Sequence, residues 1–325
     1  MLPCRSWLEQ AAINLSKKAH RGAATFIPWL LVFGLSAAPS LADLLPNGAD
    51  HREIALSDAD GRPMIAARIG NTEGRLMFDT GTPDALFLNR DALPIGEGEP
   101  VAVGQAASGQ VIEVRSHPAP AIEIGGVAFA TGPKLRSGDF GFAEIGLGSD
   151  FLGFIGTPAV VTGAFLLDHG RKVLTVLRVN EDGSLVANSP ALSDVVAVVP
   201  FTLIEVLPTT EVQINGSSVV LEFDTGDSGT FYVKEETLAR LREAGLLRET
   251  EGVATLAEAS FGGNIFRDLQ VRIVIAGGDE DTRSDTGGDT LRLGADFLVQ
   301  WPTLWNYRAG TITFLTPGAY TPGSP

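Results

Sequence analysis

Leu-Met-Phe-Asp-Thr-Gly at residues 76–81 and Leu-Glu-Phe-Asp-Thr-Gly at residues 221–226 are two copies of one motif. In each copy an Asp-Thr-Gly turn ends an apolar run that is typical of a buried strand. A carboxylate at the end of a buried strand is unfavourable unless it has a partner. If the two strands meet, Asp79 and Asp224 can face each other and share one proton. A third Asp-Thr-Gly, at residues 285–287, follows a polar segment and is discounted.

Other features repeat around the motif with nearly constant spacing. Ile69 and Ile214 each lie 10 residues before the motif aspartate. Leu-Gly-x-Asp-Phe-Leu follows at residues 147–152 and 293–298, with its glycine 69 and 70 residues after that aspartate. This pattern predicts one strand-rich unit used twice, and so an all-β chain with two lobes related by a pseudo-two-fold axis.

The paired turns and the later Leu-Gly-x-Asp-Phe-Leu segments resemble those of the aspartic peptidases. The short lobes resemble bacterial retropepsin-like domains fused in tandem, over about residues 52–316. The resemblance implies a two-lobed acid-protease β-barrel fold with short helices. It also implies a catalytic pair, Asp79 and Asp224, supported by Thr80, Gly81, Thr82, Thr225 and Gly226, with Gly148 and Gly294 packed below.

In this family a hairpin called the flap covers bound substrate. Residues 107–126 and 259–278 match each other, since each segment begins with Ala-Ser and ends with Gly-Gly. The first segment starts near the position where retropepsin-like lobes carry the flap. The candidate flap residues are Ser108, Gly109, Phe261 and Gly262.

The sequence departs from the family pattern in three places. Thr82 is the hydroxyl residue expected after the first motif, but Asp227 follows the second, where an extra carboxylate would raise the pKa of the pair. Neither candidate flap tip carries the tyrosine of pepsin-like enzymes. Residues 148–168 span 20 positions, against 12 for residues 294–306, which indicates an insertion in the first lobe.

Composition divides the chain into five segments. A basic stretch, an apolar run and Ser-Leu-Ala before Asp43 predict a signal peptide at residues 1–42, with an uncleaved anchor as the alternative. The remaining predicted segments are an N-terminal lobe at 52–178, a polar linker at 179–194, a C-terminal lobe at 195–316 and a disordered tail at 317–325.

Charge and cysteine content limit the functional classes. Cleavage after Ala42 removes Cys4, the only cysteine, which excludes a disulfide framework and thiol catalysis. The removed segment has four basic residues and one acidic residue, so the formal charge changes from −15 to −18. We expect a periplasmic or secreted monomer that acts on a polypeptide substrate. We expect no cofactor, no metal, no nucleic acid partner and no stable membrane insertion after signal cleavage.

Three competing interpretations remain, one of which is that each lobe pairs with its twin in another chain. Residues 226–229 spell Gly-Asp-Ser-Gly, a serine-protease signature, but His51, His117 and His169 lack the flanking residues of a catalytic histidine. The stronger alternative is a catalytically silent peptide-binding module with the same two-lobed fold. We favour an aspartic endopeptidase over this module because both motif aspartates are present.

Overall fold

The computed structural model describes residues 39–321, apart from 107, 187–190, 251–252, 282 and 284–287. Strands make up most of the regular structure, and the helices are short, so the predicted all-β class is confirmed. Residues 1–38 of the predicted signal peptide and the third Asp-Thr-Gly lie outside the described residues, as do 187–190 of the linker and 322–325 of the tail.

The first half of the chain holds twelve of the described strands. They are β1 (His51–Ala59), β2 (Arg62–Ile69), β3 (Thr72–Asp79), β4 (Leu86–Asn89), β5 (Glu99–Gln105), β6 (Val111–Pro118), β7 (Ile122–Ile124), β8 (Val127–Ala128), β9 (Lys134–Gly138), β10 (Phe151–Gly156), β11 (Ala164–Asp168) and β12 (Val173–Leu177). The helical turns are η1 (Leu41–Leu44), η2 (Gly141–Ala143), α2 (Glu144–Leu147) and η3 (Thr157–Ala159).

The second half follows with strands and two helices. The strands are β13 (Ala191–Leu192), β14 (Val195–Pro200), β15 (Thr202–Ile204), β16 (Leu207–Ile214), β17 (Ser217–Phe223), β18 (Thr230–Val233), β19 (Leu247–Thr250), β20 (Val253–Phe261), β21 (Asn264–Ile275), β22 (Thr290–Leu293), β23 (Thr303–Asn306), β24 (Thr311–Leu315) and β25 (Tyr320–Thr321). The helices are α3 (Glu235–Glu243) and α4 (Ala295–Leu298).

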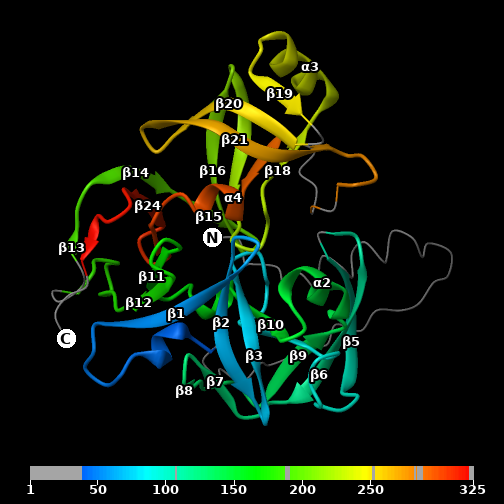
Figure 1. Ribbon diagram of the computed structural model, residues 1–325, viewed down its shortest axis with the longest axis vertical. Coiled ribbons are helices and arrows are strands. Elements are labelled where there is room, and N and C mark those ends of the chain that lie inside the picture. The colour runs from blue at the N-terminus through cyan, green and yellow to red at the C-terminus, as the bar shows by residue number, and fades with distance from the viewer. Residues whose placement is uncertain are drawn as a thin grey trace, which may run out of the picture.

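The same strand order occurs in both halves. It is β3-β10-β4-β9-β6-β5 in the first and β17-β22-β18-β21-β20-β19 in the second. The strand directions also match. β3 runs parallel to β10, as β17 runs parallel to β22. β4 runs antiparallel to β10, as β18 runs antiparallel to β22. In Figure 1 the first set lies below and the second above. One unit is therefore used twice, as the repeated motif predicted.

A continuous run of strands joins the two halves. Its order is β14-β24-β23-β11-β12-β1, and its central pair, β11 and β23, aligns Phe165 with Trp305. The ring of Phe165 stacks on that of Trp305 at 5.5 Å and meets Phe78 edge-on at 4.8 Å, while Phe223 lies 6.3 Å from Trp305. Because Phe78 and Phe223 precede the motif aspartates, this aromatic cluster supports both motif strands from below.

Two glycine turns give the true register between the halves. Gly125 and Gly262 have φ of 56° and 58°, and a Cβ on either would lie 2.8 Å from a buried side chain, Ile54 in one case and Val199 in the other. The β7–β8 turn therefore corresponds to the β20–β21 turn. The predicted match of residues 107–126 with 259–278 is wrong by one hairpin, because Ala-Ser and Gly-Gly pairs recur in turn-rich β sequence.

The predicted second flap is wrong for the same reason. Phe261 is only 5% exposed and stacks on Phe266 at 4.2 Å, so it belongs to the core. Gly262 lies against Ala197 and Val199 of β14. In the corrected register, the counterpart of the β5–β6 tip is the β19–β20 turn, whose residues 251–252 lie outside the described part of the chain.

The prediction of a disordered tail from residue 317 is wrong in its described part. Tyr320–Thr321 forms β25, which pairs antiparallel with β13 at Ala191–Leu192. Ala319 is buried in a small cluster with Leu166, Leu304 and Leu315. The Pro/Gly-rich composition misled the prediction, because a two-residue pairing leaves no periodic signal.

The segment before β1 packs on the main core. Leu41 and Leu44, both in η1, are buried there, and Ser40 caps this turn by accepting a hydrogen bond from Ala42 N. Cleavage after Ala42 would therefore remove Leu41 from the core and leave Leu44 in it.

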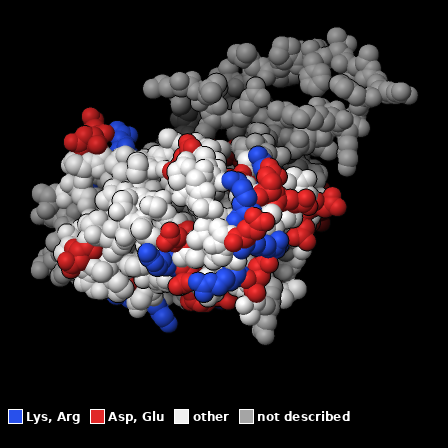
Figure 2. Space-filling view, turned by 90° about the horizontal axis from the view of Figure 1, so that it is seen from above, with Lys and Arg blue, Asp and Glu red and all other residues white. Residues whose placement is uncertain are grey.

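Within the described residues, no helix is both long and apolar enough to cross a bilayer. On the face shown in Figure 2, lysine and arginine side chains alternate with acidic ones and form no continuous basic patch.

Candidate functional site

The two motif aspartates lie against each other's turns. Asp79 ends β3, and Asp224 follows β17. A Cβ built on Gly81 would lie 2.7 Å from Asp224 Oδ2, and one built on Gly226 would overlap the carboxylate of Asp79. Each carboxylate thus occupies the space that a side chain on the opposite glycine would need. The fold brings the predicted pair together, and only glycine fits at either turn.

Two threonines interlock the turns. Thr80 N donates to Thr225 Oγ1 at 3.0 Å, and Thr225 N donates to Thr80 Oγ1 at 3.0 Å. The Thr225 hydroxyl donates across to the Phe78 carbonyl at 2.7 Å, and the Thr80 hydroxyl to the Phe223 carbonyl at 3.3 Å. Both threonines are 1% exposed, so the four bonds form away from solvent. This reciprocal network fixes the spacing of the two aspartates.

Backbone amides bind the inner oxygen of each aspartate. Gly81 N donates to Asp79 Oδ1 at 2.8 Å, and Gly226 N donates to Asp224 Oδ1 at 2.9 Å. The Thr82 hydroxyl donates to Asp79 Oδ2 at 2.7 Å. Every residue expected to support the pair therefore contacts it or its interlock.

The glycines packed beneath the two turns are Gly156 and Gly294. A Cβ on Gly156 would overlap the carbonyl oxygens of Thr82 and Asp84, and one on Gly294 would overlap the Asp227 carbonyl. Gly148 was predicted for the first position, and that prediction is wrong. It follows α2, where a Cβ would meet the side chains of Arg75 and Asp150 instead.

The correction also removes the predicted insertion after residue 148. Gly156 lies 12 residues before Asp168, as Gly294 lies 12 before Asn306. The extra residues of the first half come earlier, before the β7–β8 turn: Gly125 lies 46 residues after Asp79, whereas Gly262 lies 38 residues after Asp224. The repeat Leu-Gly-x-Asp-Phe-Leu misled the prediction, because it precedes β10 in one half and follows β22 in the other.

The first candidate flap does form a hairpin tip. Ser108 and Gly109 lie in the turn between β5 and β6, where Gly109 N donates to the Ala106 carbonyl at 2.8 Å and Gln105 Nε2 donates to the Gly109 carbonyl at 3.0 Å. Residue 107 lies outside the described residues. A covering role for this tip stays a prediction.

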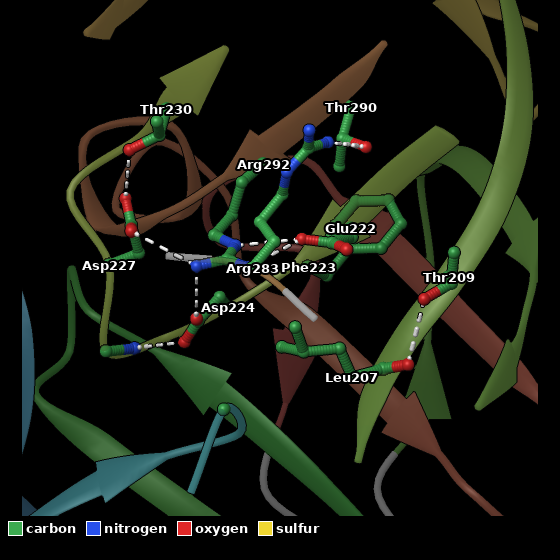
Figure 3. Close-up of polar contacts among 12 residues, drawn as sticks. Leu207, Thr209, Glu222, Phe223, Asp224, Asp227, Thr230, Arg283, Thr290 and Arg292 are labelled. Atoms are coloured by element: carbon green, nitrogen blue, oxygen red, sulfur yellow. Dashed lines mark hydrogen bonds and ion pairs between the residues drawn. The ribbon is translucent and has the colours of Figure 1, made fainter. Parts of the chain in front are cut away.

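The second turn has different side chains beside its aspartate (Figure 3). Asp227 Oδ1 accepts hydrogen bonds from Gly229 N at 2.7 Å and from the Thr230 hydroxyl at 3.1 Å. Arg292 Nη1 lies 3.6 Å from Asp227 Oδ2 and 3.8 Å from Asp224 Oδ2. Glu222 holds this guanidinium, accepting from its Nε at 2.9 Å.

Burial and charge act together on Asp224. Desolvation raises the pKa of Asp224 well above its usual range, the nearby charge of Asp79 raises it further, and Arg292 opposes both effects. Asp224 is 6% exposed, whereas Asp79 is partly exposed. A raised pKa favours one shared proton on the pair at mildly acidic pH.

Sequence reasoning missed several residues that contact the site. Arg62 Nε, on β2, donates to the Gly226 carbonyl at 2.9 Å. The Thr157 hydroxyl donates to the Thr80 carbonyl at 2.8 Å and lies 3.2 Å from the buried Tyr307 hydroxyl. The sequence does hold an indication for Arg292, because it is a cation between two leucines at residues 291–293. No sequence pattern indicates the other residues.

The sequence was compared with known proteins. It matches no protein-family model, and no curated protein matches it.

Proposed function

We propose that this protein is an aspartic endopeptidase with the two-lobed aspartic-protease fold. The observation that carries the proposal is the packing of each aspartate over the glycine of the opposite Asp-Thr-Gly turn. The threonine interlock and the duplicated strand order support it, because they explain how one chain supplies both carboxyls at a fixed spacing.

The chemistry follows from two adjacent carboxyl groups that share one proton. The ionised group takes a proton from a water bound between them, and the water oxygen attacks the peptide carbonyl carbon. The protonated group gives its proton to the carbonyl oxygen, which yields a tetrahedral intermediate. A carboxyl then protonates the nitrogen, the other carboxylate takes a proton from one hydroxyl of the intermediate, the carbon–nitrogen bond breaks, and acid and amine products leave. No covalent enzyme intermediate forms, and the pair is restored to one proton.

The surroundings of the pair suit this cycle. Gly81 N, Gly226 N and the Thr82 hydroxyl hold three of the four carboxylate oxygens, which orients the remaining lone pairs. The raised pKa of Asp224 keeps a proton on the pair in mildly acidic solution. We propose acid to mildly acidic activity of a secreted or periplasmic monomer, since one chain provides both halves of the site.

Casein cleavage between pH 3 and pH 7, with and without pepstatin, tests the proposal. Asp79→Asn and Asp224→Asn should each lower the rate by about 10²- to 10⁴-fold, the range for loss of a general acid or base. Asp182→Asn is the matched control, because Asp182 is an exposed loop residue bonded to Ser184. Light scattering on the active sample should show a monomer.

Two outcomes would contradict the proposal. Cleavage that persists in both Asn variants would separate the activity from the pair. Wild-type protein that is as inert as the variants at every pH would favour the silent peptide-binding module.

A further inference from the structure

The two aspartates differ in what holds their second oxygen. For Asp79, the Thr82 hydroxyl donates to Oδ2 at 2.7 Å. The residue at the matching position of the second turn is Asp227, which has no proton to donate when ionised. Its Oδ1 is already bound by Gly229 N and Thr230 Oγ1. Asp227 therefore cannot hold Asp224 Oδ2 as Thr82 holds Asp79 Oδ2.

Arg292 instead forms an ion pair with Asp224 Oδ2, at a distance longer than a hydrogen bond. Its Nη1 lies 3.8 Å from Asp224 Oδ2 and 3.6 Å from Asp227 Oδ2, between the two carboxylates. Glu222 Oε2 accepts from Nε at 2.9 Å and pairs with Nη2 at 2.8 Å, which fixes the direction of the guanidinium. The Tyr232 ring lies 5.5 Å from the guanidinium carbon. Figure 3 shows the arginine pointing toward all three acids.

The first half has no charge at the matching positions. The strand registers align Phe78 with Ile155 and Phe223 with Leu293, so Met77 and Phe154 correspond to Glu222 and Arg292. A cation that is 8% exposed is costly unless it is paired. In the second half, the Glu222–Arg292 ion pair thus occupies the place of the apolar Met77–Phe154 pair, and Asp227 occupies the place of the Thr82 hydroxyl.

We infer that Arg292 is a positioning residue: it takes the place of the missing hydroxyl, holds Asp224 Oδ2 in line and offsets the charge of Asp227. This inference rests on the proposed function, because it concerns the same pair. The ionisable groups around Arg292 and Asp224 are Glu222 on β17, Asp227 in the turn, Tyr232 on β18, Asp79 on β3, Asp296 on α4, Tyr307 after β23, and Arg283, which lies over the Tyr232 ring.

Arg292→Met and Asp227→Thr should shift the pH dependence of cleavage in opposite directions. Arg292→Met leaves Asp227 and Glu222 unopposed, so the acid limb of the kcat–pH profile should move up by about 1 pH unit or more. On that limb kcat falls about tenfold per unit, while KM stays nearly constant. Asp227→Thr removes a carboxylate and supplies a hydroxyl, so the limb should move down. The double variant should return close to the wild-type profile.

A second readout does not need activity. The Asp224 carboxyl titration, followed by carbon-13 NMR, should move in the same directions as the kinetic limb in each variant. Arg75→Met is the matched control, because Arg75 is a partly buried arginine paired with Asp150 in the first half. It should leave both readouts unchanged. If Arg292→Met fails to fold, Asp227→Thr and Arg292→Lys, which keeps the charge and should keep the profile, carry the test.

Failure of the inference and failure of the proposed function give different results. If wild-type protein cleaves casein but Arg292→Met keeps its pH profile and its Asp224 titration, the inference is overturned. If nothing cleaves casein but the titration moves as expected, the positioning role stands and the peptidase proposal falls.

Discussion

The two halves share a strand order but not the side chains around the aspartate pair. Met64, Met77 and Phe154 belong to an apolar cluster beside the first turn. Thr209, Glu222 and Arg292 occupy the matching register in the second half. Strand order, glycine turns and the threonine interlock repeat, whereas polarity does not. The duplicated strands therefore fix the positions of the two aspartates. The side chains beside each turn separately determine the electrostatic surroundings of its aspartate.

Substituting the motif glycines should have the largest effect. Gly81→Ala and Gly226→Ala each place a methyl group against the carboxylate of the opposite turn, so we expect the cleavage rate to fall by about 10²-fold or more. Gly146→Ala is the control, since nothing lies within 4 Å of a Cβ there. Equal activity of all three variants would show that the turns are not in contact.

The glycines beneath the turns test the corrected register. Gly156→Ala and Gly294→Ala would force a methyl group onto backbone carbonyls, so we expect each to destabilise the protein by about 3 kcal/mol, the upper range for overpacking. Urea unfolding followed by circular dichroism measures this, with Gly146→Ala again as control. A large effect at Gly294 but none at Gly156 would break the equivalence of the two positions.

The interlock should show coupling across the halves. Thr80→Val and Thr225→Val each leave a buried amide without its acceptor, at a cost of about 2 kcal/mol. Each change removes two of the four bonds and lets the turns move apart, which weakens the two that remain, so the double variant should cost less than the sum by about 1 kcal/mol. Thr202→Val, on the exposed strand β15, should have little effect. Strict additivity would contradict the reciprocal network.

The smallest expected effect is a pH dependence of stability. Because the pKa of Asp224 is higher in the folded protein, the folded state binds more protons between the unfolded and folded pKa values, and stability falls as pH rises through that interval. Asp224→Asn abolishes this loss. The Tm of the variant relative to wild type should therefore be higher at pH 7 than at pH 4, by about 2 °C or more.

Asp150→Asn should show the opposite trend. Arg75 holds the pKa of Asp150 below its usual range, so that carboxylate stabilises the folded state at higher pH and the stabilisation is lost as pH falls through the folded pKa. The Tm of this variant relative to wild type should be lower at pH 7 than at pH 3. The same sign for both variants would contradict the assignment of a raised pKa to Asp224.

Local sequence patterns predicted most of the residues of the site. They were less successful in predicting which residues of the two halves are equivalent. The two apolar runs ending in Asp-Thr-Gly indicated the meeting of Asp79 with Asp224, because a buried carboxylate needs a partner. The position equivalent to Gly294 could not be found from these patterns, because Gly156 ends a strand, β10, whose flanking residues differ from those of β22. Phe261 was misplaced because a hydrophobic residue beside Gly-Gly fits a loop tip and a core turn equally well. The Arg292 contacts depend on β22 lying beside β17, which spacing alone does not give.

The antiparallel pairing of β11 with β23 has a consequence for any attempt to divide the molecule. Each strand forms one border of its own half and is buried by the other. A half expressed alone would present a bare row of amides and carbonyls, with Phe165 or Trp305 uncovered beside it. The exposed edge of such a fragment could pair with the same edge of a second copy. We therefore expect the fragment to form symmetric dimers or aggregates.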